Sequence, residues 1–569
     1  MIPQNRLKIR NGFLLLFEKV IIAGGVLNQK YYQFLQKKKQ LKGKDSVWLI
    51  HVNNFKNVQF SAANNRISSQ KNRLTWVSYY IVLLKHLADN SSNTSIFIKR
   101  VEIPFPVHDV FNYHARNKAI DRLIPPWGLL KIIKRNNGLG IGETCILELQ
   151  CGPFKLRWIA KHFGYVQDQV FQDEMIRGPL KSWRHTHSFT PNALGGCMLE
   201  DKIEYSLPYG FNRFNILRKQ LNKTLKEMFS YRHRILQNDM KLWELLKENK
   251  GKRILITGST GLIGSALIPL LEAAGEHKIS RLIRPSSKYS DNGNSSNFRV
   301  WDPETGIVAH NDLEGFDTII HLSGESIGGR WSKKKKKRIH DSRVKTTELL
   351  CDGIKNLKKP PSTLLCASAI GYYGSRGEEV VTEESMPGHG FLANLCVDWE
   401  DRAKSVESIG IRVVNARFGL ILSPKGGILK ILDLASCLKT GITFGNGSNI
   451  FNWVSIEDVI GGIMYAIDNT TMRGPINMVS PNPAKSSDFF KIISKIQENQ
   501  IFLRFGPRFM ELALGDFADT ISESNGVVKP QKLLSAGYPF MSPCLEDAVR
   551  LLLGRQINTK TERGILESR

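Results

Sequence analysis

The sequence lacks the features of a membrane-spanning protein and of a structural metal site. Its eight cysteines are scattered, without a C-x-x-C pair and without a histidine at metal-ligand spacing. No run of eighteen apolar residues is present, so no transmembrane helix is expected. These absences predict a cytoplasmic protein with reduced cysteines in its core and no metal site.

Acidic residues are few, 52 against 80 lysines and arginines, and the net charge is +28. A basic balance occurs in proteins that bind nucleic acid or anionic membranes, and also as a general compositional trait. We favour the second explanation. The basic run at 333–337 separately indicates a solvated helix face, because no aromatic residues are interleaved with it. Nucleic acid is therefore not an expected partner.

A chain of 569 residues is too long for a single core and predicts two to four domains. Residues 1–93 form a basic extension without a motif, and residues 556–569 form a tail. Between them we expect an α+β unit at 94–248, a nucleotide-binding domain at 250–482 and a small domain at 483–555 that completes the substrate side.

Residues 94–248 begin with a strand-like run over 95–103 and a short helix over 106–115. Five more strand-like runs follow, and a long helix covers 211–248. This order resembles the START-like helix-grip (SRPBCC) superfamily, in which a curved antiparallel sheet encloses a cavity against a long helix. The resemblance implies an apolar ligand. Five aromatic side chains either line that cavity or fill the core, and they are Trp127, Trp158, Phe163, Phe171 and Trp183.

Two histidines of this unit, His185 and His187, are two residues apart on one strand and share one face. The sequence offers no carboxylate and no third ligand close to them. We therefore predict a surface pair and not a metal site.

The clearest motif is a glycine turn, G-x-x-G-x-x-G, which follows an apolar strand over 254–256 and opens a helix over 265–274. Gly258 allows a tight turn, Gly261 allows the backbone to approach a pyrophosphate, and Gly264 allows the helix to pack on the sheet. The helix N-terminus offers unpaired N–H groups to the phosphates. The motif and the later alternation of strands and helices predict an α/β fold with a Rossmann-type, doubly wound parallel sheet.

Arg284 ends the second strand of this fold, where a domain that prefers NAD carries an acidic residue for the ribose hydroxyls. A guanidinium at this position suits a 2′-phosphate, because it forms bidentate charge-assisted hydrogen bonds. We therefore predict NADP, with NAD as the alternative. An ordinary surface arginine at a strand end is the simpler explanation of the same residue.

Residues 252–555 resemble the atypical extended short-chain dehydrogenase/reductases labelled the epimerase family, which carry a C-terminal domain of unknown function. The resemblance rests on phrases at 257–264, 321–325, 341–343, 368–374, 417–421 and 529–537. A START-like domain fused in front also resembles bacterial members of this group. The resemblance implies dinucleotide contacts from Gly258, Thr260, Gly261, Leu262, Ile263, Arg284, Leu322, Ser323, Gly324, Arg343 and Ile421.

The chain departs from this superfamily at the catalytic positions. The superfamily uses Ser, Tyr and Lys, and the lysine lowers the pKa of a tyrosine four residues before it. Extended members often carry a glutamate four residues after the lysine. Counting back from Glu400 places Cys396 at the lysine and Leu392 at the tyrosine, and neither performs that proton transfer. Ser368 matches the serine, and Tyr372 is the candidate phenol.

Tyr373 is the alternative phenol, and Glu383 with Glu384 is another candidate acid–base pair. Two functions remain open. The first is an NADP-dependent oxidoreductase or epimerase acting on a small hydroxy or keto compound or a nucleotide sugar, with an apolar ligand in the helix-grip unit. The second follows from the missing Tyr-x-x-x-Lys pair: a cofactor-binding regulatory or scaffold protein related to cell division, as some relatives of the group are labelled.

Overall fold

The structure is a computed structural model that describes most of the chain after residue 93. The described residues are 94–116, 118–128, 130–136, 138–151, 154–208, 215–246, 251–275, 277–285, 297–308, 310–444, 447–506 and 525–555. The predicted basic extension at 1–93 and the tail at 556–569 lie outside them.

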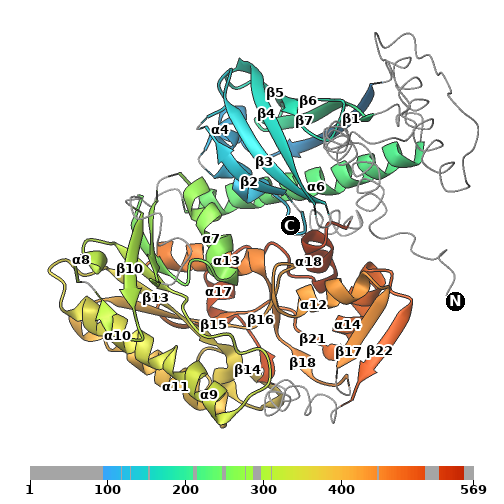
Figure 1. The fold of residues 1–569 in the computed structure, drawn as a ribbon. Helices are drawn as coiled ribbons and strands as arrows, with labels where there is room; N and C mark the ends of the chain where they lie inside the picture. Colours follow the sequence, from blue (N-terminus) through green and yellow to red (C-terminus); the bar gives the residue numbers. More distant parts are fainter. Residues whose placement is uncertain are drawn as a thin grey trace, which may run out of the picture.

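The first unit is a seven-stranded antiparallel sheet in the order β1-β7-β6-β5-β4-β3-β2 (Figure 1). Each strand-like run of the sequence corresponds to one of its strands, and β2 is an additional one. The bounds are Ser95–Ile103 for β1, Leu130–Arg135 for β2, Thr144–Cys151 for β3, Phe154–Val166 for β4, Val170–Arg177 for β5, Ser182–Pro191 for β6 and Cys197–Ser206 for β7.

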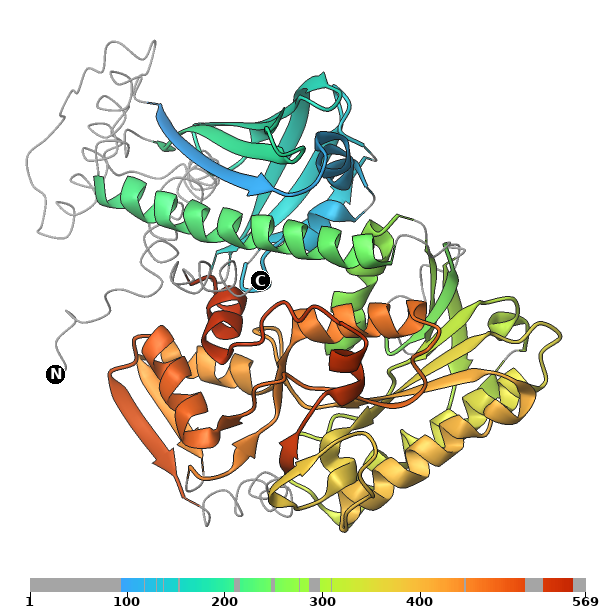
Figure 2. The same cartoon turned by 180° about the vertical axis from the view of Figure 1, so that it is seen from behind.

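Three helices accompany this sheet: α4 (Val107–Ala115), α5 (Ala119–Leu123) and the long α6 (Asn215–Leu245), which crosses one face (Figure 2). Buried and part-buried residues alternate along β7, so one face of the sheet carries the core. Leu221, Leu225 and Phe229 recur at helical spacing on α6 and belong to that core. The side chains on this face are therefore enclosed between sheet and helix.

The second unit is built on an eight-stranded sheet in the order β11-β10-β9-β8-β12-β13-β15-β20. All its pairs are parallel except β10 with β11, which confirms the predicted Rossmann-type sheet. The strand order reverses between β8 and β12, which leaves a crevice at their carboxyl ends. The bounds are Arg253–Thr257 for β8, Lys278–Ile283 for β9, Phe298–Asp302 for β10, Ile307–Val308 for β11, Thr318–His321 for β12, Thr363–Ala369 for β13, Arg412–Phe418 for β15 and Gly474–Met478 for β20.

Helices cover both faces of the parallel sheet (Figure 1). α7 (Leu262–Ala273) packs against α13 (Ile456–Asp468) on one face, and α10 (Val344–Lys355) packs against α9 (Lys333–Asp341) and α11 (Phe391–Lys404) on the other. Every residue of α13 is buried, because the first unit and the C-terminal segment also cover it.

A smaller lobe draws its elements from both sides of the predicted boundary at 482. Strands β17 and β22 pair in parallel, and α12 and α14 pack on β17. A second parallel pair joins β14 to β23, and α17 and α18 follow. The bounds are Gly377–Val381 for β14, Gly427–Ser436 for α12, Thr440–Phe444 for β17, Ser486–Ile496 for α14, Ile501–Phe505 for β22, Asn525–Val528 for β23, Gln531–Ser535 for α17 and Leu545–Leu552 for α18.

In the described part of the chain, no helix is both long enough and apolar enough to cross a membrane. The cysteines whose side chains are described are all free thiols. Cys197, Cys351, Cys366 and Cys396 lie in the core as predicted, whereas Cys437 and Cys544 are exposed.

A buried ion triad joins the two units. Arg122 on α5 donates to both carboxylate oxygens of Asp239 on α6 at 2.8 and 2.9 Å. Its third nitrogen lies 2.6 Å from Glu457 on α13. Tyr113 and Tyr231 donate further hydrogen bonds to Asp239 and Glu457. The charged side chains are at most 4% exposed, so a single cation compensates one buried carboxylate from each unit.

Replacing Arg122 by Met should therefore lower the free energy of unfolding by about 3–5 kcal/mol, the usual effect of removing one partner of a buried ion pair. Denaturant unfolding measures the loss. The deficit should shrink at acidic pH, because burial raises the pKa of Asp239 and protonation then removes its uncompensated charge. Arg184→Met is the matched control, since Arg184 is 61% exposed in its pair with Glu174, and it should change stability by less than about 1 kcal/mol. Equal effects of the two substitutions would contradict the structural role of the triad.

Candidate functional site

The turn after β8 depends on two glycines. Gly258 has φ +64°, and a Cβ on it would stand 2.6 Å from the Leu322 carbonyl oxygen. A Cβ on Gly264 would stand 2.5 Å from the Gly258 carbonyl oxygen, so α7 packs directly on the loop. α7 begins at Leu262 with Gly261 as its N-cap, and no side chain caps its first N–H groups. This backbone cradle fits the phosphates of a dinucleotide.

The two strands that border the crevice are tied together at their ends. The Thr257 hydroxyl lies 2.8 Å from His321 Nδ1 and accepts the N–H of Leu322 at 3.1 Å. Burial lowers the pKa of His321 to about 4, so this ring is neutral at physiological pH. The tie fixes the backbone of Leu322 beside Gly258.

The predicted apolar contacts gather around this crevice. Leu262, Ile263, Leu322 and Ile421 are partly buried and pack on the main core. Ile421 lies in β16 (Leu420–Leu422), and the loop after it reaches α7, since a Cβ on Gly426 would lie 3.1 Å from Leu262 Cδ1. Thr260 is exposed and Ser323 is half-buried at the same edge. The structure thus brings these positions together, and their contact with a dinucleotide stays a prediction.

Arg343 covers the turn that follows β12. A Cβ on Gly324 would stand 3.2 Å from the Arg343 guanidinium carbon, so the two residues are in close contact. Its Nη1 donates to the carbonyl oxygens of Glu325 and Ile339 at 3.0 and 3.2 Å, and the guanidinium lies over the Trp399 ring. Arg343 is thereby held at the crevice edge where the family resemblance places it.

A group of cations surrounds Glu325 just beyond this turn. Lys335 on α9 donates to Glu325 at 2.7 Å, and Arg338 lies 3.7 Å from the same oxygen. The hydrogen bond from Lys335 lowers the pKa of Glu325, and the positive charges of Arg338 and Arg284 add to the effect. Arg284 follows β9 and is exposed. The basic run is therefore not simply a solvated helix face, because Lys335 is only 14% exposed.

Ser368 sits at the end of β13 inside a buried polar network. Its hydroxyl donates to Glu400 at 2.7 Å, and Arg417 binds both oxygens of that carboxylate at 2.8 and 2.9 Å. All three side chains are 2–3% exposed. The Ser368 hydroxyl is thus held by a carboxylate whose charge an arginine already compensates.

The two neighbouring tyrosines have different surroundings in the short helix η4 (Ile370–Tyr373). Tyr373 accepts from Arg417 at 2.9 Å and donates to Asn477 at 2.7 Å, and burial raises its pKa to about 12. Tyr372 is half-buried, with the Arg417 guanidinium carbon 3.4 Å from its ring centroid. Its hydroxyl has no hydrogen-bond partner among the described residues. Tyr372 is therefore the phenol that remains available to a ligand.

The residues at the missing catalytic positions are apolar or neutral. Leu392 packs on Gly371, and a Cβ added to Gly371 would lie 3.1 Å from the Cβ of Leu392. Cys396 is 2% exposed, and burial raises the pKa of its thiol to about 12. Glu383 is buried and accepts backbone N–H groups, whereas Glu384 is exposed, so these two do not face one site.

Sequence reasoning missed the roles of Arg417 and Asn477. Arg417 lies in β15, where every residue after Arg412 is buried, and Asn477 lies in the neighbouring strand β20. A charged residue inside a buried strand was the available signal, because such a charge requires a buried partner.

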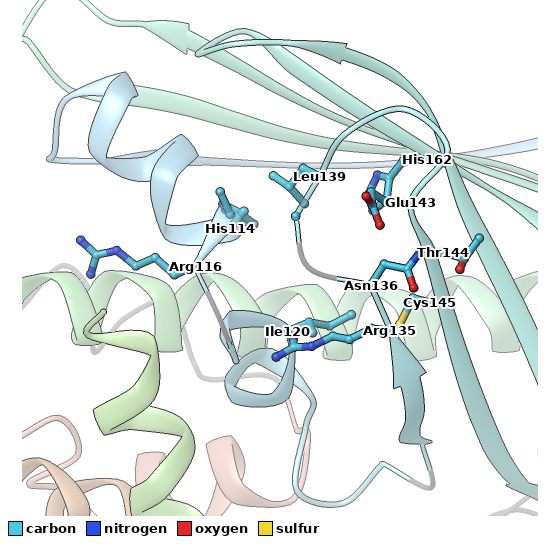
Figure 3. A pocket seen from close by; sticks show the side chains of 12 residues that line it. His114, Arg116, Ile120, Arg135, Asn136, Leu139, Glu143, Thr144, Cys145 and His162 are labelled. Carbon is cyan, nitrogen blue, oxygen red and sulfur yellow. The ribbon is translucent and has the colours of Figure 1, made fainter. Parts of the chain in front are cut away.

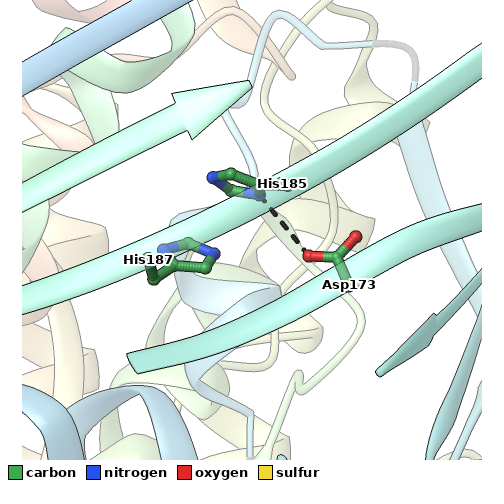
Figure 4. A group of neighbouring side chains, drawn as sticks. All are labelled: Asp173, His185 and His187. Carbon is green, nitrogen blue, oxygen red and sulfur yellow. Dashed lines mark ion pairs between the residues drawn. The ribbon is translucent and has the colours of Figure 1, made fainter. Parts of the chain in front are cut away.

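The prediction of a surface pair at His185 and His187 is wrong. Both side chains are buried, at 5% and 9% exposure, and both lie beside Asp201 (Figure 4 shows the pair with Asp173). Burial lowers the pKa of His185, but the neighbouring carboxylates of Asp173 and Asp201 raise it to about 9. Burial lowers the pKa of His187 to about 3. The partners come from neighbouring strands, which sequence distance does not reveal.

The N-terminal unit also encloses a cavity of about 290 Å³ between α4, β2, β3 and β4 (Figure 3). Its walls are of mixed character: His114, Arg135, Asn136, Glu143 and His162 are polar, and Ile120 and Leu139 are apolar. None of the five predicted aromatic residues lines this cavity. Phe171 is 3% exposed in the core, and Trp158 and Trp183 meet edge to face with ring centroids 5.1 Å apart.

The strand order, the glycine turn and the start of α7 at the crevice define a Rossmann-type protein built to bind a dinucleotide. The sequence profile of the NAD dependent epimerase/dehydratase family matches residues 254–479. The chain is 33% identical over 297 residues to the epimerase family protein Mb2239 of Mycobacterium bovis, covering 52% of this chain and 96% of the relative. The chain therefore belongs to the NAD-dependent epimerase/dehydratase family through its C-terminal part, and a nicotinamide cofactor is supported.

Two further relatives agree. Epimerase family protein YfhF of Bacillus subtilis is 32% identical over 301 residues, covering 53% of this chain and 97% of the relative. The crystal structure of a nucleoside-diphosphate sugar epimerase from Corynebacterium glutamicum is similar over 83% of this chain and 93% of that one, with 30% identity and a TM-score of 0.67. That similarity extends beyond the region matched by the family profile.

Replacing Gly258 by Ala should abolish dinucleotide binding and lower the thermal midpoint. Gly306→Ala is the control, because Gly306 also has positive φ, +75°, but a Cβ there would meet nothing within 4 Å. Both substitutions carry the left-handed backbone cost of about 1–2 kcal/mol. Only G258A adds the clash with Leu322, about 1–3 kcal/mol of overpacking. Calorimetric titration with NADPH and thermal unfolding measure the two effects, and equal behaviour of the two variants would refute the close approach as the cause.

Proposed function

We propose that the protein is an NADP-binding oxidoreductase or epimerase that acts on a nucleotide sugar or a small hydroxy or keto compound. The observation that carries the proposal is the crevice between β8 and β12, where the glycine cradle, the Leu322 backbone and Arg343 converge. A bound nicotinamide supplies or accepts a hydride there. The similarity to a nucleoside-diphosphate sugar epimerase supports a nucleotide sugar as substrate.

The preference for NADP rests on charge at the adenosine end. Arg284 follows β9, and Lys335 and Arg338 meet it around Glu325. The 2′-phosphate on the adenosine ribose carries two negative charges, which several cations are needed to compensate. Guanidinium groups bind phosphate oxygens in a bidentate manner. The negative charge of Glu325 offsets the repulsion among Arg284, Lys335 and Arg338 when no cofactor is bound. The 2′-phosphate therefore binds to a preformed site.

Proton transfer is assigned to Tyr372. Its ring lies against Arg417, which places a positive charge beside the phenol in a chain that lacks the usual lysine. Arg417 is itself fixed by both oxygens of Glu400, so its position over the ring is held. Ser368 orients the same carboxylate and borders the site.

A second candidate function is a catalytically reduced regulatory or scaffold protein that still binds the cofactor. The neutral Cys396 thiol and the packed Leu392 favour it, because the thiol carries no positive charge and the leucine has no proton to exchange. In either case we propose that the N-terminal unit is a helix-grip, ligand-binding domain. The apolar ligand expected for it stays a prediction, and the cavity of this unit offers both polar and apolar side chains to a ligand.

Replacing Arg284 by Gln should weaken NADPH binding about tenfold or more, about 1.4 kcal/mol, and leave NADH binding unchanged. Arg338→Gln should act in the same direction. Lys337→Gln is the matched control, since Lys337 lies on the same helix but is 73% exposed and pairs with Asp341. Fluorescence titration of the wild type and the three variants, each with NADPH and with NADH, measures the affinities. A parallel loss for both cofactors would mean that Arg284 does not discriminate the 2′-phosphate.

The two candidate functions differ in the effect of Tyr372→Phe. For an enzyme, this change should lower turnover at least about a hundredfold, the usual contribution of a general acid or base, with NADPH affinity retained. Ser368→Ala should lower turnover less, because Arg417 still holds Glu400. The assay is a panel of carbonyl compounds with NADPH consumption measured, and of nucleotide sugars with the epimer ratio measured. Absence of turnover in the wild type, with tight NADPH binding, favours the regulatory function.

A further inference from the structure

The N-terminal unit buries a cluster of imidazole and carboxylate groups that the dinucleotide crevice does not use. His185 and His187 lie on one face of β6 (Figure 4). Asp173 on β5 is the register partner of His185, and Asp201 on β7 is the register partner of His187. Register partners project to the same side of an antiparallel sheet, and His233 reaches the cluster from α6 on that side. Four elements therefore contribute to one site.

The distances separate two kinds of contact. His185 Nε2 lies 3.1 Å from Asp201 Oδ1, and His233 Nε2 lies 2.5 Å from Asp201 Oδ2, and both are hydrogen bonds. The other nitrogen of His185 lies 3.5 Å from Asp173 Oδ2, which is too long for an ordinary hydrogen bond. Ligands of one tetrahedral zinc ion stand about 3.4 Å apart, given bonds of about 2.1 Å. The gap between His185 and Asp173 matches that spacing.

The arrangement of His185 is the one that metal-bound histidines adopt. Such a histidine binds the ion through one ring nitrogen and donates the other N–H to a carboxylate, which fixes the tautomer. Here Asp201 accepts from Nε2, which leaves Nδ1 facing Asp173, and a metal ion that binds there takes the place of the proton on Nδ1. One ligand atom each from Asp173, His185 and His187 lies within 4.8 Å of the others.

Internal hydrogen bonds do not satisfy the whole cluster. His187 Nδ1 lies 2.7 Å from Asp201 without hydrogen-bond geometry, and His233 Nδ1 has no hydrogen-bond partner among the described residues. The side chains of His185, Asp201 and His233 are at most 6% exposed. Leaving buried polar atoms without partners is costly, so a purely structural network would be expected to satisfy them.

We propose that Asp173, His185 and His187 bind a divalent transition-metal ion of the zinc class, with Asp201 as the carboxylate that orients His185. Imidazole nitrogen combined with carboxylate oxygen suits Zn²⁺, Co²⁺ or Fe²⁺, whereas Mg²⁺ and Ca²⁺ take oxygen ligands. The set of two histidines and one carboxylate leaves coordination positions open for a further ligand.

The neighbouring cavity gives this ion a route and room for that further ligand. His162, which lines the cavity, is the register partner of Asp173, and the ring of His114 lies 5.6 Å from the ring of His187 (Figure 3). The Nδ1 atom of His162 is buried without a hydrogen-bond partner among the described residues. The cavity wall and the proposed metal site are therefore adjacent, and a small oxygen-bearing ligand in the cavity reaches the ion.

The test uses the tag-free full chain, stripped with a chelator and titrated with Co²⁺ while the visible d–d absorption is followed. We expect one equivalent to bind and Zn²⁺ to displace it, and Zn²⁺ to raise the thermal midpoint. His187→Gln and Asp173→Asn should each weaken Co²⁺ binding by at least about tenfold, the loss seen even when outer partners of metal ligands are removed.

His108→Gln is the matched control, because His108 forms a surface pair with Asp168 and is 65% exposed, and its Co²⁺ binding should equal that of the wild type. Circular dichroism and thermal unfolding without metal establish that each variant is folded. Wild-type protein that shows neither saturable Co²⁺ absorption nor a shift with Zn²⁺ overturns the proposal, even if the variants unfold. Unchanged binding in folded His187→Gln overturns it as well.

Discussion

The second unit depends on the close approach of two backbone segments, at Gly258 and Leu322. A side chain at 258 would stand 2.6 Å from the Leu322 carbonyl oxygen, and the left-handed φ of +64° at the same residue excludes most other amino acids. The approach brings the ends of β8 and β12 together at the reversal of strand order. It therefore fixes the direction of α7 and the place of the turn at 322–324, on which Arg343 rests.

The loss of the catalytic lysine has not left the site without positive charge. Arg417 occupies the buried side of Tyr372, and its guanidinium meets Glu400 through both nitrogen–oxygen pairs. A lysine has one mobile ammonium group, whereas an arginine bound in this way has a fixed orientation. In the proposed proton transfer, Tyr372 therefore has beside it a fixed cation that Glu400 partly neutralises.

The sequence was sufficient for features that depend on local order, and insufficient for those that depend on strand neighbours. The glycine spacing and the apolar run before it predicted the turn, because turn and helix start lie within ten residues. Alternation placed His185 and His187 on one face, but it does not tell which face is buried. Their partner Asp201 comes from the next strand and His233 from α6, so the register, and not the spacing, creates the cluster. Arg417 escaped notice for the same reason.

The two units are bound into one structure by charges that neither can bury alone. Arg122 belongs to the first unit, and without Glu457 it would pair only with Asp239, while Glu457 would lose its cation. Separation of the two units would therefore expose the apolar surface of α13 and leave the Glu457 carboxylate without its cation. The helix α6 carries Asp239 at this interface and His233 at the histidine cluster, six residues apart on one rigid element. The histidine cluster and the interface therefore share one helix, and the triad makes the N-terminal unit part of the same folded body as the dinucleotide site.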